Sequence, residues 1–319
     1  GGEGSGAHPV ASLPLEAMRG VNVEGHAGVG RLDYRGLDLD DVRLDFRLVD
    51  GLLTLERANL RVAGGTLENS GHLDARGQAP AARLRTGIAG VRAEPFLRAF
   101  AGAAPLTGRL DTTLALDTAG ATLDAWIGAL DGRVAASFAE GAIEGINIAR
   151  ELRVAAARLQ GEEVEAAAGT RRTDFSVLRL SARIDDGVLR SDDLDLRTPL
   201  LRVGGSGSLD LRKMELDYTT RVLLTGTLEG EGGRAANELR GLEVPIRFSG
   251  ALADPAIEVR LAEALERRRK ARAEAELEQE KAEAEQALEK EKQQLEQEKK
   301  KAEERARKEL EEELQKLFE

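Results

Sequence analysis

The stretch Val42-Arg43-Leu44-Asp45-Phe46-Arg47-Leu48 decides the fold of the first 260 residues, because apolar and charged side chains alternate along it without exception. Successive side chains of a β-strand point to opposite faces of the sheet, so the apolar residues share one face and the charged residues share the other. The same alternation recurs at 194–197, 209–212, 246–248 and 257–260. The pattern predicts an antiparallel sheet with one apolar face and one face in water.

Turn signals separate these runs, and two segments repeat the same order of features. Residues 49–74 and 184–210 both begin with an Asp-Gly turn, continue through a Gly-Gly pair and end with a Ser-Gly run that leads to Leu-Asp. Each copy is predicted to form a hairpin-like unit of strands. Units that stack edge to edge give quasi-linear architectures, so we expect an elongated sheet of about 14–18 strands, spaced about 4.8 Å apart.

The sequence divides into three predicted regions. Residues 1–9 resemble a flexible linker, since Gly1-Gly2-Glu3-Gly4-Ser5-Gly6 has almost no side chains to pack, and the chain is expected to be a fragment of a longer protein. Residues 10–260 form the predicted β body. Short helices are expected to interrupt its strands at 94–101, 123–130 and 149–160. Residues 261–319 form the third region.

The last region is predicted to be one long helix. All 35 Gly and all 8 Pro precede Leu261, and the 59 residues that follow contain 19 Glu and 15 Lys or Arg. Gly and Pro are the strongest helix breakers, whereas Ala, Glu, Lys, Leu, Gln and Arg favour helices. At about 1.5 Å per residue the helix would be about 90 Å long.

Two interpretations of this helix stay open. Leu277, Ala284, Leu288, Leu295 and Ala302 follow part of a heptad spacing, which favours a coiled coil. Many of the other seam positions are Ala, Glu or Lys, which favours a solvated single helix with Glu–Lys pairs four residues apart. Docking of the helix on the β body is a further alternative, through Leu310, Leu314, Leu317 and Phe318.

The composition excludes several classes of function. The chain has no cysteine, which removes disulfides, thiol catalysis and Cys-ligated zinc. The net charge of −11 argues against nucleic acid as a partner, because binding to phosphates needs a basic surface. Apolar residues make up 41% of the chain but aromatic residues only 3%, which favours a thin sheet over a thick globular core. The sequence has no apolar run of 18 residues, so no transmembrane helix is expected within it.

No constellation of catalytic or metal-binding residues stands out. His8, His26 and His72 are scattered without metal-ligand spacing, and we expect no metal site. The segment Gly205-Ser206-Gly207-Ser208 lies between strands and lacks the following helix that a phosphate loop needs. The paired aspartates near 185 and 192 are explained by turn chemistry. We therefore expect neither an enzyme nor a cofactor.

A succession of motifs between residues 90 and 260 resembles the C-terminal region of the AsmA family. These motifs include Gly141-Ala142-Ile143-Glu144-Gly145, Thr173-Asp174-Phe175-Ser176-Val177-Leu178 and Leu201-Arg202-Val203-Gly204-Gly205. Two residues depart mildly from the family pattern, because Asn147 stands where Asp is expected and Thr198 where Ser is commoner.

The resemblance implies a location and a function. AsmA-like proteins are anchored in the inner membrane of Gram-negative bacteria, with most of their mass in the periplasm, and this implies an anchor in a missing N-terminal part. They resemble bridge-like lipid transfer proteins, in which a curved sheet forms an apolar trough for phospholipids. The expected function is therefore to carry phospholipid between the inner and outer membranes and to support the envelope.

The apolar positions of the alternating runs are the candidate lining of this groove, because an apolar face must bury itself against something, and acyl chains suit an aliphatic lining. They are Val42, Leu44, Phe46, Leu48, Leu194, Leu196, Leu209, Leu211, Ile246, Phe248, Ile257 and Val259.

Two alternatives to a lipid groove remain at this stage. The same residues could form a sealed sandwich or barrel core without any groove. Independently of the core, the protein could be a non-enzymatic assembly factor whose sheet edge and long helix bind envelope proteins, or a scaffold whose long helix only spaces it or pairs two copies.

Overall fold

A computed structural model describes residues 15–159, 161, 171–225 and 239–317. The chain separates into two compact units, Gly1–Ala264 and Leu265–Glu319. The predicted linker 1–9 lies outside the described residues. The first unit contains the sheet and the short helices, and the second consists of a single helix.

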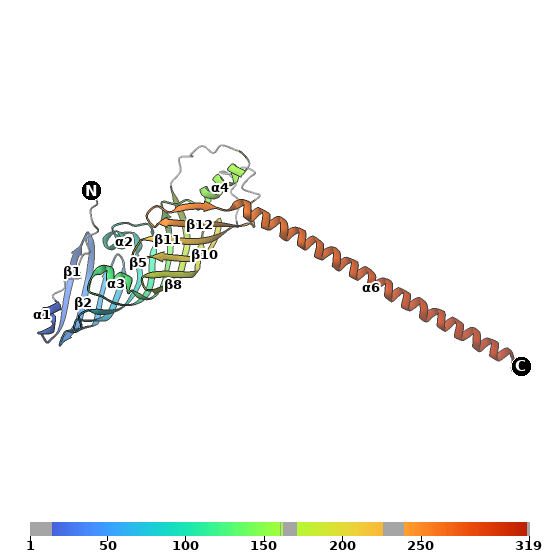
Figure 1. Cartoon of the computed structure of the whole chain (residues 1–319), viewed down its shortest axis with the longest axis horizontal. Helices are drawn as coiled ribbons and strands as arrows, with labels where there is room; N and C mark the ends of the chain where they lie inside the picture. Colours follow the sequence, from blue (N-terminus) through green and yellow to red (C-terminus); the bar gives the residue numbers. More distant parts are fainter. Residues whose placement is uncertain (1–14, 160, 162–170, 226–238, 318–319) are drawn as a thin grey trace. The chain divides into compact units, whose positions relative to one another are not determined.

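Thirteen strands form one antiparallel sheet in which every strand pairs with its neighbours in sequence (Figure 1). The strands are β1 (Val23–Tyr34), β2 (Leu37–Val49), β3 (Leu52–Val62), β4 (Gly65–Asp74), β5 (Ala81–Arg92), β6 (Arg109–Ala119), β7 (Asp131–Glu144), β8 (Arg172–Asp185), β9 (Val188–Arg197), β10 (Leu201–Asp210), β11 (Glu215–Leu224), β12 (Glu243–Ala251) and β13 (Ala256–Val259). The predicted open antiparallel sheet is confirmed. The described residues form thirteen strands where 14–18 were expected, and twelve spacings of about 4.8 Å make this sheet about 58 Å long.

The predicted helices are also present, with small shifts at their ends. The structure has α1 (Leu15–Arg19), α2 (Ala93–Ala101), α3 (Leu123–Gly128), α4 (Ile148–Leu159) and the long α6 (Leu261–Leu317). Helix α1 was not predicted, because its five residues are too few for a periodic pattern. The Thr122 hydroxyl caps α3 by accepting a hydrogen bond from the amide of Ala125, and Gly102 ends α2 in the left-handed conformation.

β-Bulges keep the apolar residues on one face where the alternation along the strand slips. In β2, Leu37 and Leu39 occupy odd positions, whereas Val42 and Leu44 occupy even ones. Asp41 lies between them with a positive φ of 49°, and the pairing with β3 shifts at the same place. This extra residue returns Val42 to the face that carries Leu39, and it bends the strand.

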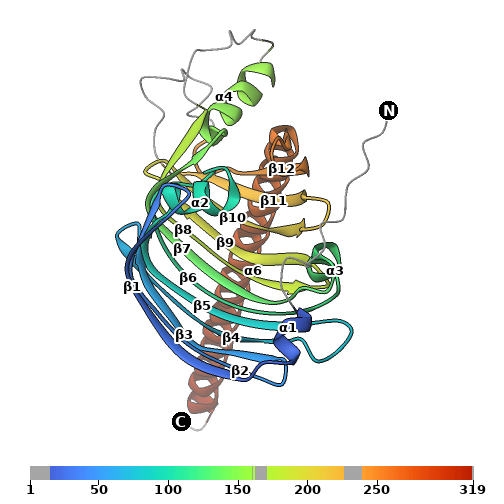
Figure 2. The ribbon, with the colours of Figure 1, turned by 90° about the vertical axis from the view of Figure 1, so that its left-hand side faces the viewer.

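The apolar face lies on the inside of the curved sheet. Met18 of α1 packs in a cluster with Leu48, Leu53, Leu73 and Ala75. The three leucines belong to the apolar face, because Leu48 pairs with Leu53, and Leu53 pairs with Leu73. Figure 2 shows the strands curving into an open trough, with α1 and α3 on its concave side along one rim and α2 near the other.

The internal repeat is confirmed only in part. The Asp-Gly turns before β3 and β9 correspond, and so do the Ser-Gly runs that end β4 and β10. The Gly-Gly pairs do not correspond. Gly64, with a φ of 86°, lies in the turn between β3 and β4, whereas Gly204 and Gly205 lie inside β10.

Candidate functional site

Eleven of the twelve candidate lining residues lie on strands and face the concave side. Their registers connect them across the sheet: Leu196 pairs with Val203 of β10, Ile246 pairs with Val259, and Phe248 pairs with Ile257. Leu211 is the exception. Its expected strand ends at Asp210, whose carboxylate accepts hydrogen bonds from the amides of Arg212 (2.9 Å) and Lys213 (3.1 Å). These bonds turn the chain, so Leu211 lies in a turn.

The accessibility of the candidate residues varies along the sheet. Leu48, Leu196 and Ile246 are buried, and the other nine are half-buried. Leu196, Val222 and Ile246 are at most 1% exposed, so the end formed by β9–β12 is sealed near the rim. Nearer β1, Val29 is 43% exposed and Leu84 of β5 is 38% exposed, although Val62, Ile88 and Leu110 on the same face are buried. Burial therefore varies along the concave face, and the open-groove and sealed-core interpretations both stay predictions.

Polar residues that the sequence patterns did not single out interrupt the apolar face. The Thr86 hydroxyl donates a hydrogen bond to the Asn69 side-chain oxygen at 2.7 Å, and these two residues pair across β4 and β5. Near the other end, the Ser191 and Tyr218 hydroxyls lie 3.2 Å apart. All four residues break the alternation that marks the lining, so a search for regular apolar positions could not find them.

Glycine makes room for an aromatic ring beside these polar residues. A Cβ atom on Gly207 would lie 2.6 Å from Cδ2 of Tyr218, its partner on the next strand. Gly25 and Phe46 repeat this arrangement at the other end of the sheet, where a Cβ would lie 3.0 Å from the ring. The Gly-rich run in β10 is therefore a site of close packing, and burial raises the pKa of the Tyr218 phenol.

A hollow of about 1250 Å³ lies in the middle of the sheet. Several strands each contribute three consecutive residues to its lining, such as Arg85-Thr86-Gly87, Arg133-Val134-Ala135 and Ser181-Ala182-Arg183. In each triplet the middle residue faces the concave side and the outer two face the charged side, because Thr86, Val134 and Ala182 share the apolar face. None of the twelve candidate lining residues borders this hollow.

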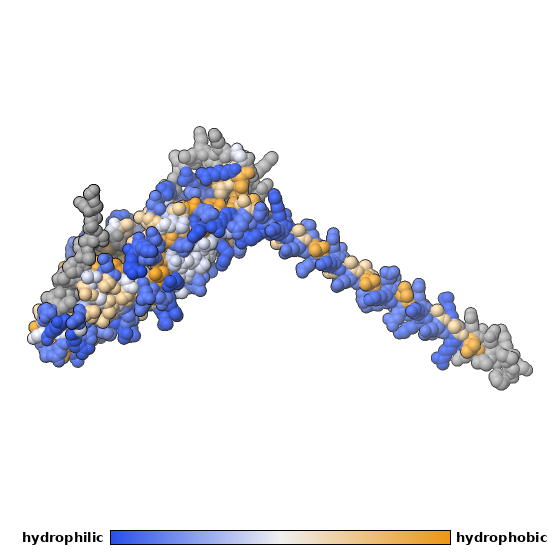
Figure 3. All heavy atoms as spheres, viewed as in Figure 1, coloured by the Kyte–Doolittle hydropathy of each residue, from blue (hydrophilic) through white to orange (hydrophobic). Residues whose placement is uncertain are grey.

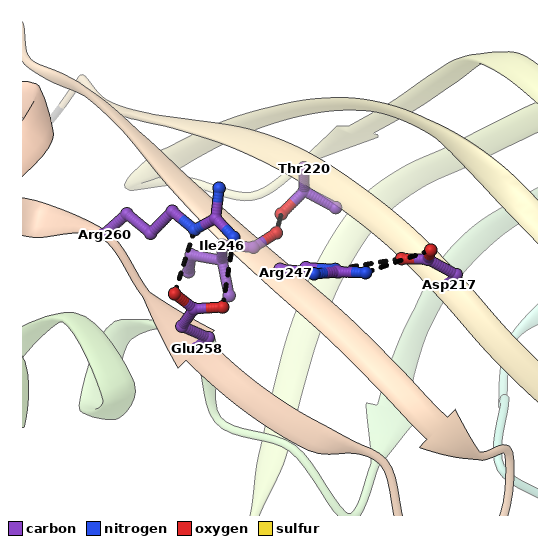
Figure 4. A network of polar contacts seen from close by, with 6 residues as sticks. All are labelled: Asp217, Thr220, Ile246, Arg247, Glu258 and Arg260. Carbon is purple, nitrogen blue, oxygen red and sulfur yellow. Dashed lines mark hydrogen bonds and ion pairs between the residues drawn. The ribbon is translucent and has the colours of Figure 1, made fainter.

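Ion pairs stabilise the charged face between neighbouring strands. Figure 4 shows Arg247 of β12 paired with Asp217 of β11 through two hydrogen bonds of 3.0 and 3.1 Å. Arg260 makes a similar two-bond pair with Glu258, two residues before it in the chain. On the concave face, the Thr220 hydroxyl donates a hydrogen bond to the carbonyl oxygen of Ile246 at 3.2 Å. The hydrogen bonds from the guanidinium groups lower the pKa of both carboxylates.

Helix α6 is polar over most of its surface (Figure 3). Leu277, Leu288, Leu295 and Leu310 form isolated hydrophobic spots and are each 51–61% exposed. The side chains of Leu314 and Leu317, and all of Phe318, lie outside the described part of the chain. The coiled-coil and docking interpretations therefore stay predictions.

The described residues contain neither a cluster of metal ligands nor a helix suited to span a membrane. Within them, no three or more His, Cys, Asp or Glu side chains are grouped so that they could hold a metal ion. None of the described helices has the length and apolar character that a membrane span requires.

Comparison with known proteins places the chain in a family. The model of the AsmA family matches residues 12–194, which is more than half of the chain. The chain belongs to the AsmA family. Protein AsmA of Escherichia coli (strain K12) is 24% identical over 241 residues, which cover 74% of this chain and 38% of that protein. No solved structure matches significantly.

The AsmA family match begins earlier in the chain than the motifs singled out in the sequence. Those motifs lie between residues 90 and 260, whereas the family match includes β1–β4 and ends within β9. The chain spans about two fifths of the length of the curated AsmA relative.

Proposed function

We propose that this AsmA-family chain holds the acyl chains of phospholipids on its concave apolar face, as part of an envelope protein that carries phospholipid between the inner and outer membranes. Membership of the AsmA family supports a function associated with the cell envelope. A periplasmic location and an inner-membrane anchor in the longer protein are part of the proposal.

One observation carries the proposal: the concave face is apolar, and part of it is open. In a sealed core, leucine and valine side chains would be covered by a second layer. Here Leu84 is 38% exposed on the concave side, and Leu44 and Phe46 are only half-buried. Removing such side chains from water is favourable by about 25 cal/mol for each Å² of apolar surface, so an acyl chain has a reason to bind.

The two ends of the sheet suggest how a lipid would lie. On β1, β2 and β5 the concave face carries the exposed or half-buried side chains of Val29, Leu44 and Leu84, whereas Leu196 and Val222 at β9–β12 are buried. We expect acyl chains to occupy the open part and to stop at the sealed end. The polar pair Asn69–Thr86 lies on β4 and β5, within the part that carries the exposed apolar residues, and it is satisfied by its own hydrogen bond, so it adds no strong trap for the cargo.

The test compares the amount of phospholipid that copurifies with each of two matched double variants. Leu44→Glu/Leu84→Glu places two carboxylates on the concave face, whereas Val49→Glu/Ala89→Glu places them on the same strands but on the charged face. Phospholipid extracted from the purified proteins is measured by mass spectrometry. We expect the first variant to lose most of the lipid and the second to retain it.

Equal lipid content in both variants, with folding intact, would contradict the proposal. Absence of lipid from the unaltered protein, together with a dimer that is lost when α6 is shortened, would instead favour the scaffold function.

A further inference from the structure

The charged face carries a row of arginines that lie unusually close to one another. Arg133 of β7 pairs directly with Arg183 of β8, and Arg183 pairs directly with Arg190 of β9. Arg85 of β5 lies in the same row, separated from Arg133 only by Ala115 of β6. Neighbouring strands are about 4.8 Å apart, so the Cα atoms of Arg133, Arg183 and Arg190 lie within about 10 Å of one another.

This arrangement destabilises the sheet unless something compensates it, because like charges directly opposite one another repel. Arg190 has one carboxylate partner, Asp185, at 3.8 Å. Among the residues that the structure describes, no ion pair forms with Arg85, Arg133 or Arg183. Elsewhere on this face arginines are neutralised across strands, as in the pair of Arg247 with Asp217.

The row borders the central hollow of about 1250 Å³. A second row of small side chains runs beside it on the charged face, and this row includes Gly87, Thr113, Ala135 and Ser181. Small residues next to long arginines leave space for a ligand beside the guanidinium groups. Five arginines border the hollow, together with only three carboxylates. These residues are Arg57, Arg85, Arg133, Arg183, Arg190, Glu56, Glu68 and Asp192.

We propose that this row of arginines on the charged face, with the row of small side chains beside it, is an anion site that binds molecules carrying two or more phosphate groups. Guanidinium groups bind phosphate oxygens through pairs of parallel hydrogen bonds, and Arg is suited to this geometry. A single phosphate would satisfy one arginine, whereas a ligand with several phosphates would reach Arg133, Arg183 and Arg190 together. The arginines of this row lie on the charged face, so the site does not depend on lipid binding on the apolar face.

The test measures the binding of inorganic tripolyphosphate by calorimetry at low ionic strength. We expect Arg133→Gln/Arg183→Gln to weaken binding about tenfold or more, since each charge-assisted contact contributes substantially to affinity. The matched control is Arg43→Gln/Arg221→Gln, which removes two exposed arginines of the same face outside the hollow. This control should bind tripolyphosphate almost as tightly as the unaltered protein.

Two further measurements keep the result interpretable. Removing repulsion should leave the ligand-free Tm of Arg133→Gln/Arg183→Gln unchanged or higher. If the Tm falls instead, the lysine variant Arg133→Lys/Arg183→Lys is used, because it keeps the two charges but lacks the planar guanidinium groups. Weaker tripolyphosphate binding by this variant, with its Tm unchanged, supports the site. Tight binding by the lysine variant would overturn bidentate recognition.

A vesicle assay distinguishes soluble phosphates from lipid headgroups. Flotation with phosphatidylglycerol vesicles, and with phosphatidylcholine vesicles as reference, is compared for the same variants. Loss of phosphatidylglycerol binding in parallel with tripolyphosphate binding would assign the site to anionic headgroups, whereas loss of tripolyphosphate binding alone would assign it to soluble phosphates. Failure of the unaltered protein to bind either probe, or equal losses in both glutamine variants, would overturn the proposal.

Discussion

At the scale of single residues, contacts between glycine and aromatic side chains define the concave face. Tyr218 crosses over Gly207, and Phe46 lies over Gly25. The sequence has a Gly-rich run at 204–207 that predicts a turn between strands, whereas the structure places this run inside β10. The residue that explains the glycines is Tyr218, eleven residues after Gly207. Its pairing with Gly207 depends on the register of two strands, which alternation alone does not fix.

The first expected outcome concerns Gly207. Gly207→Ala should reduce the free energy of unfolding by about 1–3 kcal/mol, because its Cβ would collide with backbone and ring atoms of Tyr218 that cannot move independently. Chemical denaturation measures this change. Gly28→Ala is the matched control, since a Cβ at Gly28 has no atom within 4 Å in the structure. Equal effects of the two substitutions would contradict the proposed packing.

The second concerns the phenol of Tyr218, whose pKa is raised above the usual 10, mainly by burial and also by the charges of Asp193 and Asp192. A raised pKa in the folded state means that its stabilising contribution is complete below the unfolded pKa and is lost as the pH rises through the folded value. The 295 nm absorbance difference between the unaltered protein and Tyr218→Phe should therefore titrate above pH 10. A midpoint at or below that of the urea-unfolded chain would show that the ring is not buried.

At the scale of elements, alternation and breakers were sufficient to predict strands, helix α6 and the short helices. The sequence did not predict where the strands change register, because bulges depend on single residues with positive φ such as Asp41 and Glu140. The residues that line the concave face were predicted only where apolar and charged residues alternate regularly along a strand. The strands around the central hollow carry Thr86, Ala182 and Ser191 on the concave face, and these residues give no apolar signal.

The third expected outcome concerns the charges along α6. Glu280 lies four residues after Glu276 and three before Glu283, so Glu280→Lys converts two repulsive pairs into attractive ones. We expect slower amide hydrogen exchange across 274–287. Glu291→Lys makes the same change of charge, but it has no charged residue three or four positions away and should leave exchange there unchanged. Equal protection in both variants would show that charge pairing does not stabilise this helix.

At the scale of the whole β body, one feature separates a lipid trough from a sealed scaffold: an apolar face that is concave and open near β1–β6. The resemblance to the AsmA family predicts a trough. A trough requires an open, curved antiparallel sheet, and the structure has such a sheet (Figure 2). The sequence could not show that one end is sealed, because Leu196 and Leu44 sit in similar alternating runs. Leu196 is 1% exposed, whereas Leu44 is half-buried.

Site-specific photocrosslinking in living cells tests lipid binding on the concave face most directly. A photoreactive amino acid at position 84 points into the open part of the trough, whereas the same residue at position 89 of the same strand points to the charged face. We expect phospholipid adducts from position 84 and almost none from position 89. Equal adduct formation at the two positions, or adducts from position 89 alone, would contradict the account.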